Sequence, residues 1–352
     1  MKILVYPYDK NPYQKLLYSA MNKKYGQGIF IRYSWFLPLL GALHFPIEIA
    51  ARRLLGYRII HIHWIAFYLR IQVPYGKTIS WYITRFNFWW IRQLGYKLIW
   101  TVHDILPHQK ETSNDLDISK RLAIQADIKI IHSNFTRDQL NLNGINSDRC
   151  VVIPHGNYDG VYEDLILRKD ARQRLGIESQ KLVFLFFGII KSYKGIDDLL
   201  ESYSRISTTN TLLLIAGKCT DTALLAKLIE YANREDVILH NQYIDDSDVA
   251  TYFKAADIVC LPFRAITTSG STMLALTFGK PIIAPRQGSI KDLPETVGYL
   301  YNPNKSNALE NSMLLTLRDF AIKDKAIASR AYADTLAWGN ISKRIYDIYA
   351  DL

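Results

Sequence analysis

Residues 182–200 read LVFLFFGIIKSYKGIDDLL, and this stretch decides the fold class. The uninterrupted apolar run from Leu182 is typical of a buried strand, and it ends at Gly188. The segment that begins at Ile196 has the apolar spacing of a helix. Lys191 and Lys194 lie in the turn between the two. A buried strand that leads through a turn into a helix is the basic unit of an α/β protein with a parallel sheet.

Strand-like and helix-like segments alternate along the whole chain, which favours mainly parallel sheets. We expect strands at residues 2–6, 59–64, 98–102, 128–132 and 151–153, and again at 182–187, 211–216, 237–240, 258–261 and 281–284. Two such sets in 352 residues predict two Rossmann-like, doubly wound domains, residues 1–160 and 161–330, joined within residues 154–175. Residues 331–352 are expected to form a helix that packs toward the first domain.

The composition is that of a globular protein with a basic excess. Lys and Arg total 43 against 33 for Asp and Glu, a net charge of +10, which favours an anionic partner. Cys150, Cys219 and Cys260 give neither a disulfide framework nor a metal-ligand spacing, which indicates a reducing, cytoplasmic setting. We expect no signal peptide at the start of the chain and no membrane-spanning helix.

Two strand-to-helix junctions of the second domain suit a diphosphate. In the first, Gly188 and Gly195 let backbone approach a ligand, and Lys191 and Lys194 neutralise phosphate charge. In the second, residues 267–281 read TTSGSTMLALTFGKP, and a helix begins in the small-residue cluster and ends at Gly279. A helix N-terminus offers unpaired N–H groups and the positive end of a dipole. A solvated turn and a simple N-cap are the alternatives, but one hydroxyl suffices for a cap and the cluster has four.

These motifs resemble the donor domain of GT-B glycosyltransferases, close to family 4 of the nucleotide-sugar enzymes. The resemblance rests on FGIIKSYKGIDDLLESY, LLLIAGK, VILHNQYIDDSDVATYFKAADIVCLPF and SGSTMLALTFGKPIIAP, in the order of the family, with ADIKIIHSNFTRDQL and VVIPHG before them. It implies a GT-B fold, in which two α/β domains face a central cleft. The donor-binding residues that it implies are Gly188, Lys191, Lys194, Gly195, Gly217, Tyr243, Thr268, Ser269, Gly270, Ser271 and His155.

The sequence departs from the family at several positions. Two glutamates that help the family hold the donor are replaced by Ile266 and Leu274, and the usual arginine after the glycine is Ile189. The pattern resembles a divergent branch of exopolysaccharide glycosyltransferases, including β-mannosyltransferase-like enzymes. That branch implies transfer from a GDP- or UDP-linked sugar to a glycan or polyprenyl-diphosphate-linked acceptor.

The lysines and the helix N-terminus would stabilise the departing diphosphate, so we expect no metal cofactor. Two acidic groups could instead ligate a metal, namely Asp115 with Asp117, and Asp245 to Asp248. Each group lies just before a predicted helix, so helix capping explains both.

The first domain is expected to bind the acceptor. His103 and Asp104 follow a strand and are suited to take the acceptor hydroxyl proton in an inverting enzyme, or to position groups in a retaining one. A loop-capping histidine beside a solvated Asp104 is the alternative. His61 and His63 alternate onto one face of a strand; a zinc site would need a third ligand, which favours a structural or acceptor-side role. The acceptor-binding candidates are Tyr8, Asn11, Tyr13, His63 and His108.

Residues 79–92, ISWYITRFNFWWIR, combine aromatic rings with arginines. Two interpretations stay open: a core helix of the first domain, or a helix that lies on an anionic membrane surface.

Two other functions are alternatives to an active glycosyltransferase. The missing glutamates favour a catalytically inactive GT-B scaffold or binding module. The net charge alone favours a nucleic-acid-binding protein. An epimerase or a phosphorylase matches the motifs less well.

Overall fold

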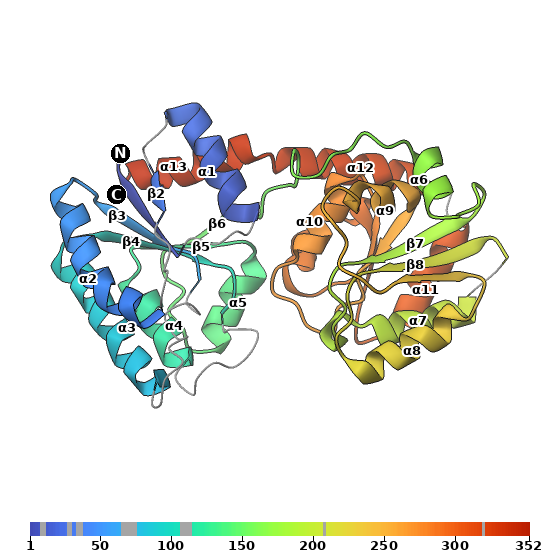
Figure 1. The fold of residues 1–352 in the computed structure, drawn as a ribbon, viewed down its shortest axis with the longest axis horizontal. Helices are drawn as coiled ribbons and strands as arrows, with labels where there is room; N and C mark the ends of the chain where they lie inside the picture. The colour runs from blue at the N-terminus through green and yellow to red at the C-terminus, as the bar shows by residue number, and fades with distance from the viewer. Residues whose placement is uncertain are drawn as a thin grey trace. The chain divides into compact units, whose positions relative to one another are not determined.

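The computed structural model describes residues 1–7, 12–26, 30–32, 38–64, 76–105, 115–206, 209–318 and 321–352. The chain divides into two compact units, residues 1–155 with 338–352, and residues 156–337. Within the described residues each unit contains a six-stranded parallel sheet covered by helices on both faces (Figure 1). The predicted α/β class with two Rossmann-like units is confirmed.

Unit 1 has the strand order β2-β1-β3-β4-β5-β6. Helices α2 to α5 cover one face of this sheet, and α1 lies beside α13 on the other (Figure 1). Its elements are β1 (Ile3–Tyr6), α1 (Pro12–Tyr25), β2 (Phe30–Arg32), α2 (Pro38–Leu54), β3 (Ile59–Ile62), α3 (Gly76–Gln93), β4 (Lys97–Val102), α4 (Asp115–Gln125), β5 (Ile128–Ile131), α5 (Asn134–Leu142), β6 (Cys150–Val152) and α13 (Trp338–Ala350).

Unit 2 has the strand order β12-β11-β10-β7-β8-β9. Helices α7, α8 and α11 cover one face, and α6, α9, α10 and α12 cover the other. Its elements are α6 (Arg168–Arg174), β7 (Leu182–Phe187), the 3-10 turn η2 (Ser192–Lys194), α7 (Ile196–Ile206), β8 (Thr211–Ala216), α8 (Thr222–Ala232), β9 (Val237–His240), α9 (Val249–Ala255), β10 (Ile258–Cys260), α10 (Gly270–Thr277), β11 (Ile282–Pro285), η3 (Gly288–Asp292), η4 (Glu295–Val297), β12 (Gly298–Tyr301), α11 (Ala308–Arg318) and α12 (Ile322–Thr335).

Each sequence pattern produces its element for a simple reason. β7 and β8 are apolar throughout because helices bury both faces of a parallel sheet. Helix α7 buries Ile196, Leu199, Leu200 and Tyr203, the spacing of a single helical face. Gly279 follows α10 with φ +62°, the left-handed conformation that ends a helix.

The C-terminal stretch differs from the prediction of a single helix over residues 331–352. Helix α12 ends at Thr335 and α13 begins at Trp338, so the stretch contains parts of two helices. The break lies where the chain passes from unit 2 to unit 1. Helix α13 buries Trp338, Ile341, Ile345 and Tyr349 against α1 and the first sheet.

The packing of α13 makes unit 1 depend on the last residues of the chain. Replacing the fully buried Ile345 by alanine should lower the free energy of unfolding of unit 1 by about 2–5 kcal/mol, because it leaves a cavity in the core. Ile327→Ala on the exposed face of α12 is the control and should change that free energy by less than about 0.5 kcal/mol. Urea unfolding measures both, and equal effects would contradict this packing.

Candidate functional site

Several of the predicted donor-side residues meet at the carboxyl end of β7. A Cβ atom added to Gly188 would lie 3.2 Å from Lys194 Nζ and 3.8 Å from Ser271 Oγ. The ammonium group of η2 and the first turn of α10 therefore converge over this glycine. β7 is the neighbour of β10, and the strand order of the sheet reverses at this pair, which is where α/β sheets bind ligands.

The backbone around this point is packed too closely for side chains. A Cβ atom on Gly217, after β8, would lie 2.0 Å from the carbonyl oxygen of Gly188. A Cβ atom on Gly195 would lie 1.9 Å from the carbonyl oxygen of Pro262, after β10. Both glycines also have φ values, +151° and +71°, that other residues rarely adopt. Gly188, Gly195 and Gly217 therefore allow the loops after β7, β8 and β10 to touch.

Arg264 fixes the residues on either side of Lys194, whose ammonium group has no counter-ion among the described residues. The Arg264 backbone N–H donates to the Tyr193 carbonyl at 2.8 Å, and its guanidinium binds the Asp198 carboxylate through two hydrogen bonds of 2.7 and 2.8 Å. Burial lowers the pKa of Lys194 to about 8. No carboxylate within the described residues forms an ion pair with its ammonium group. Lys191 is exposed, and its Nζ donates to Thr220 Oγ1 at 3.3 Å.

Of the four hydroxyls in residues 267–271, only that of Ser269 caps α10. Ser269 Oγ accepts the Thr272 backbone N–H at 3.0 Å. Thr268 Oγ1 and Thr272 Oγ1 are buried polar atoms, and neither has a hydrogen-bond partner within the described residues. Buried hydroxyls without partners are rare, because each loses the water that it had in the unfolded chain. They leave hydrogen-bonding capacity beside Gly270 and Ser271.

Tyr243, another predicted donor-side residue, lies at the same edge of the sheet of unit 2. Tyr243 follows β9, and its ring is exposed. Ile266 is half-buried, and Leu274 is buried in the core of unit 2. The two positions at which the family carries glutamates are thus apolar.

Unit 1 contains a cluster of five histidines, namely His61, His63, His103, His132 and His155. The rings of His61 and His63 stack at 4.2 Å, so the prediction that they share one face is confirmed. The ring of Trp64 stacks on that of His103 at 4.6 Å, and Tyr13 meets the His103 ring edge-on at 4.7 Å.

A hydrogen-bonded chain connects three of these rings. His132 Nδ1 lies 2.9 Å from the Ile153 carbonyl oxygen, so Nδ1 carries the proton and Nε2 accepts. His103 Nδ1 then donates to His132 Nε2 at 3.4 Å, and His63 Nδ1 donates to His103 Nε2 at 3.2 Å. The Tyr18 hydroxyl completes the chain by donating to His63 Nε2 at 2.7 Å. With neutral rings, one carbonyl thus fixes the tautomer of all three histidines.

Burial keeps these imidazoles neutral. It lowers the pKa of His61 to about 3 and that of His132 to about 4, and it holds the pKa values of His63 and His103 well below 6.5. Neighbouring histidines add a smaller effect in the same direction for His63, His103 and His132.

The chain changes the expected division of roles between His103 and Asp104. Both ring nitrogens of His103 lie within hydrogen-bonding distance of other histidines, so it could take up a proton only by losing one of these bonds. Asp104 is half-buried immediately after it. The role of general base stays a prediction for this pair, and the geometry favours Asp104.

The acceptor-side candidates occupy different places. Tyr13 and His63 are buried among the histidines, below the surface of unit 1. His155, a predicted donor-binding residue, lies in unit 1, where it is half-buried and contacts the ring edges of Tyr13 and Trp338. Tyr8, Asn11 and His108 lie outside the described residues.

Sequence reasoning missed the cluster although its signal was present. Four adjacent strands of unit 1, β3 to β6, are each followed by a histidine within three residues. The carboxyl ends of parallel strands meet at one edge, so these side chains had to gather there. His132 was not singled out although it lies within ADIKIIHSNFTRDQL, and Tyr18 belongs to none of the motifs identified in the sequence.

One carboxylate of each acidic group that could ligate a metal is paired with an arginine. Asp117 accepts from Arg121 Nε at 2.7 Å and from Trp81 Nε1 at 2.9 Å. The group Asp245 to Asp248 supplies the N-cap residue of α9, Asp248, as predicted, but its carboxylate accepts from Arg174 Nη2 at 2.8 Å and makes no capping hydrogen bond. Within the part of the chain that the structure describes, no three His, Cys, Asp or Glu side chains are placed to hold a metal ion.

Helix α3 is both a core helix and an exposed aromatic one. Phe88 and Ile91 are buried in unit 1. Ile79, Tyr82, Phe86 and Trp89 are exposed, and their spacing of three or four residues places them on one face. Among the described helices, none is long and apolar enough to cross a membrane.

Comparisons with known proteins agree with this geometry. Residues 168–334 match the family model described as glycosyl transferases group 1. The GDP-mannose:glycolipid 4-beta-D-mannosyltransferase of Xanthomonas campestris is 24% identical over 271 residues, 74% of this chain and 72% of that protein. A D-inositol 3-phosphate glycosyltransferase of Xylanimonas cellulosilytica is 24% identical over 224 residues, 60% of this chain and 54% of that protein.

Solved structures show the same fold over the whole chain. HepE of Anabaena, in complex with UDP, has a TM-score of 0.76 at 17% identity and covers 100% of both chains. Sucrose-phosphate synthase of Thermosynechococcus elongatus has a TM-score of 0.73 at 19% identity and covers 99% of this chain and 98% of that one. Unit 2 is therefore a glycosyltransferase group 1 domain, and the chain has the GT-B fold.

The neutral histidines make unit 1 sensitive to acid. Below pH 6.5 the unfolded chain binds protons at these imidazoles, whereas the folded chain does not until the pH nears 4. The free energy of unfolding should therefore fall as the pH falls through this window, by about 1.4 kcal/mol per pH unit for each histidine. Melting temperatures between pH 7 and 5 measure this slope. His132→Gln should reduce it, and the exposed His44→Gln should not; equal slopes for all three proteins would contradict the assignment.

Proposed function

We propose that this protein is a metal-independent glycosyltransferase that moves a hexose from a nucleotide-diphosphate sugar to a glycan or polyprenyl-diphosphate-linked acceptor in surface polysaccharide synthesis. The observation that carries the proposal is the convergence of Lys194 Nζ and the first turn of α10 over Gly188. Cleavage of a sugar–nucleotide bond leaves negative charge on the departing diphosphate. A fixed ammonium group and free helix N–H groups stabilise that charge as it develops.

GDP-mannose is the leading donor candidate, and UDP-linked sugars are the second. The Xanthomonas relative is named for GDP-mannose and a glycolipid. The Anabaena structures contain UDP and UDP-glucose. The diphosphate is common to both donors, so the Lys194 site suits either.

Asp104 would take the proton of the acceptor hydroxyl if the reaction inverts the sugar. The neutral His103 beside it would then be a positioning residue whose orientation His63 and His132 fix. In a retaining reaction, both residues would position the acceptor only.

Removing the Lys194 ammonium group tests the donor site. Wild-type protein in EDTA should be stabilised by one nucleoside diphosphate and should slowly hydrolyse the matching nucleotide sugar. Lys194→Ala should abolish the thermal shift, because the buried cation that binds the diphosphate is gone. The exposed Lys227→Ala is the matched control and should behave as wild type.

Other outcomes of this experiment discriminate the alternatives. A requirement for a divalent metal would contradict metal independence. If no nucleotide or nucleotide sugar shifts the melting temperature of wild-type protein, the inactive scaffold becomes the better explanation, and the apolar Ile266 and Leu274 would be its cause.

We also propose that the exposed face of α3 binds an anionic membrane surface, where a polyprenyl-linked acceptor would reside. This face presents Ile79, Tyr82, Phe86 and Trp89. Arg85 and Arg92 are exposed on the same helix, and residues 76–93 contain no Asp or Glu. Tryptophan and tyrosine rings favour the membrane interface, and arginines attract anionic headgroups.

Vesicle binding tests this surface. Wild-type protein should sediment with vesicles that contain phosphatidylglycerol more strongly than with pure phosphatidylcholine, and less strongly as salt rises. Phe86→Ser with Trp89→Ser should reduce binding severalfold, because both rings leave the interface. Leu142→Ser, at a highly exposed apolar residue of α5, is the control. An equal loss in the control would overturn the assignment to α3.

A further inference from the structure

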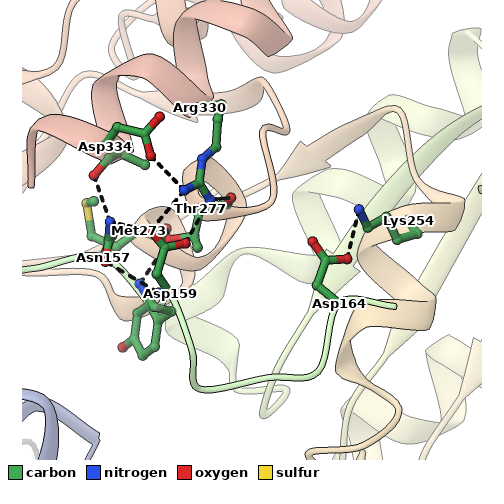
Figure 2. A network of polar contacts seen from close by, with 10 residues as sticks. Asn157, Asp159, Asp164, Lys254, Met273, Thr277, Arg330 and Asp334 are labelled. Atoms are coloured by element: carbon green, nitrogen blue, oxygen red, sulfur yellow. Dashed lines mark hydrogen bonds and ion pairs between the residues drawn. The ribbon is translucent and has the colours of Figure 1, made fainter. Parts of the chain in front are cut away.

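The segment that enters unit 2 is anchored by a dense polar network. The Asn157 backbone N–H donates to the Leu336 carbonyl at 3.0 Å, and its side-chain amide donates to the Ala333 carbonyl at 3.0 Å. Arg330 binds the Asp159 carboxylate with both terminal nitrogens at 2.8 Å. Figure 2 shows Asn157, Asp159 and Arg330 of this network. It also shows the ion pair of Asp164 and Lys254 at 2.8 Å. The segment is thus fixed to α12 and α9.

The same network fixes Tyr158 to the last turn of α10. The Tyr158 backbone N–H donates to Thr277 Oγ1 at 3.1 Å, and that hydroxyl donates to the Met273 carbonyl at 2.7 Å. Arg330 Nη1 donates to the Thr277 carbonyl at 2.7 Å (Figure 2). The backbone of residue 158 therefore has a defined position at the C-terminal end of this helix.

The side chain of Tyr158 reaches the other end of α10. A Cβ atom added to Gly270 would lie 2.7 Å from the Tyr158 hydroxyl and 3.8 Å from Cζ. Gly270 is followed directly by Ser271, whose Oγ lies near Gly188 together with Lys194 Nζ. The phenol therefore reaches the residue next to Ser271, and the Ser271 hydroxyl and the Lys194 ammonium group both lie close to Gly188.

The environment keeps this phenol protonated. Burial, with a smaller contribution from Tyr162, raises the pKa of Tyr158 to about 12. At neutral pH the hydroxyl is an uncharged hydrogen-bond donor beside a helix N-terminus, where an anion is favoured.

We propose that Tyr158 is a donor-binding residue whose hydroxyl donates a hydrogen bond to the diphosphate bound at the first turn of α10. This inference rests on the proposed function and extends its site by a residue that belongs to none of the family motifs in the sequence. Lys194 and the helix supply positive charge, and Tyr158 supplies a directional, uncharged bond. Its role explains why Gly270 has no side chain, since a methyl group there would collide with the hydroxyl.

Tyr158→Phe removes the hydroxyl and leaves the ring. We expect the dissociation constants of both the nucleoside diphosphate and the nucleotide sugar to rise about tenfold or more by calorimetry, because a hydrogen bond to a charged group is lost. The melting temperature of the unliganded protein should stay near that of wild type. Tyr162→Phe is the matched control. The ring of Tyr162 is partly buried, its centroid lies 6.3 Å from that of Tyr158, and it has no contact with Gly270. This variant should bind the nucleoside diphosphate and the nucleotide sugar with wild-type affinity.

A second variant tests the geometry independently. Gly270→Ala should weaken nucleotide binding and lower the melting temperature, because its Cβ displaces the Tyr158 hydroxyl. The double variant Tyr158→Phe/Gly270→Ala should recover the melting temperature, since the colliding oxygen is absent. A melting temperature that stays low in the double variant would show that the hydroxyl does not lie at Gly270.

The outcomes separate this inference from the function on which it rests. If Tyr158→Phe binds nucleotide as wild type does while Lys194→Ala does not bind it, Tyr158 has no role and the proposed function stands. If Tyr158→Phe weakens only the nucleotide sugar, the hydroxyl contacts the sugar and its assignment to the diphosphate is wrong. If wild-type protein binds no nucleotide at all, both proposals fail.

Discussion

The close packing of backbone against backbone at the carboxyl ends of β7, β8 and β10 is the constraint on which the donor side depends. Gly217 lies against the carbonyl of Gly188, and Gly195 lies against that of Pro262, at separations that exclude any Cβ atom. Side chains at these positions would push the loops apart. Without them, the η2 turn and the first turn of α10 both come close to Gly188, where Lys194 Nζ and Ser271 Oγ each lie within 4 Å of the position of an added Cβ atom.

The partners of the Lys194 ammonium group differ from those of two other cations in the interior of unit 2, Arg172 and Lys280. Arg172 donates to the carbonyls of Ala255, Ser179 and Lys181 and pairs with Asp257. Lys280, whose pKa burial also lowers to about 8, donates to the Ala256 carbonyl. These cations stabilise the fold because protein oxygens compensate their lost hydration. The ammonium group of Lys194 forms no ion pair with a carboxylate of the described residues. An arriving anion would supply the missing partner, as electrostatic preorganisation requires.

The sequence predicted those features whose cause is local. The strands at Leu182–Phe187, Thr211–Ala216 and Val237–His240 have the predicted bounds, because a buried parallel strand needs an apolar run. Strand β2 was missed because three residues in an aromatic and basic segment give no pattern, and β12 because its four residues, GYLY, follow turns directly. The contact of Tyr158 with Gly270 joins residues far apart in the sequence, so no local signal could reveal it.

The histidine chain shows why a sequence motif can bring two candidate residues together without deciding which of them is the general base. The sequence places His103 and Asp104 together after β4, and both are therefore candidates for the base. Only the three-dimensional structure shows that His63 and His132 occupy the two nitrogens of His103. A protonated imidazole beside a carboxylate would make it a weaker base, whereas a neutral one does not. An array that burial keeps neutral and one carbonyl orients is therefore compatible with the proposal that the neighbouring carboxylate, Asp104, accepts a proton.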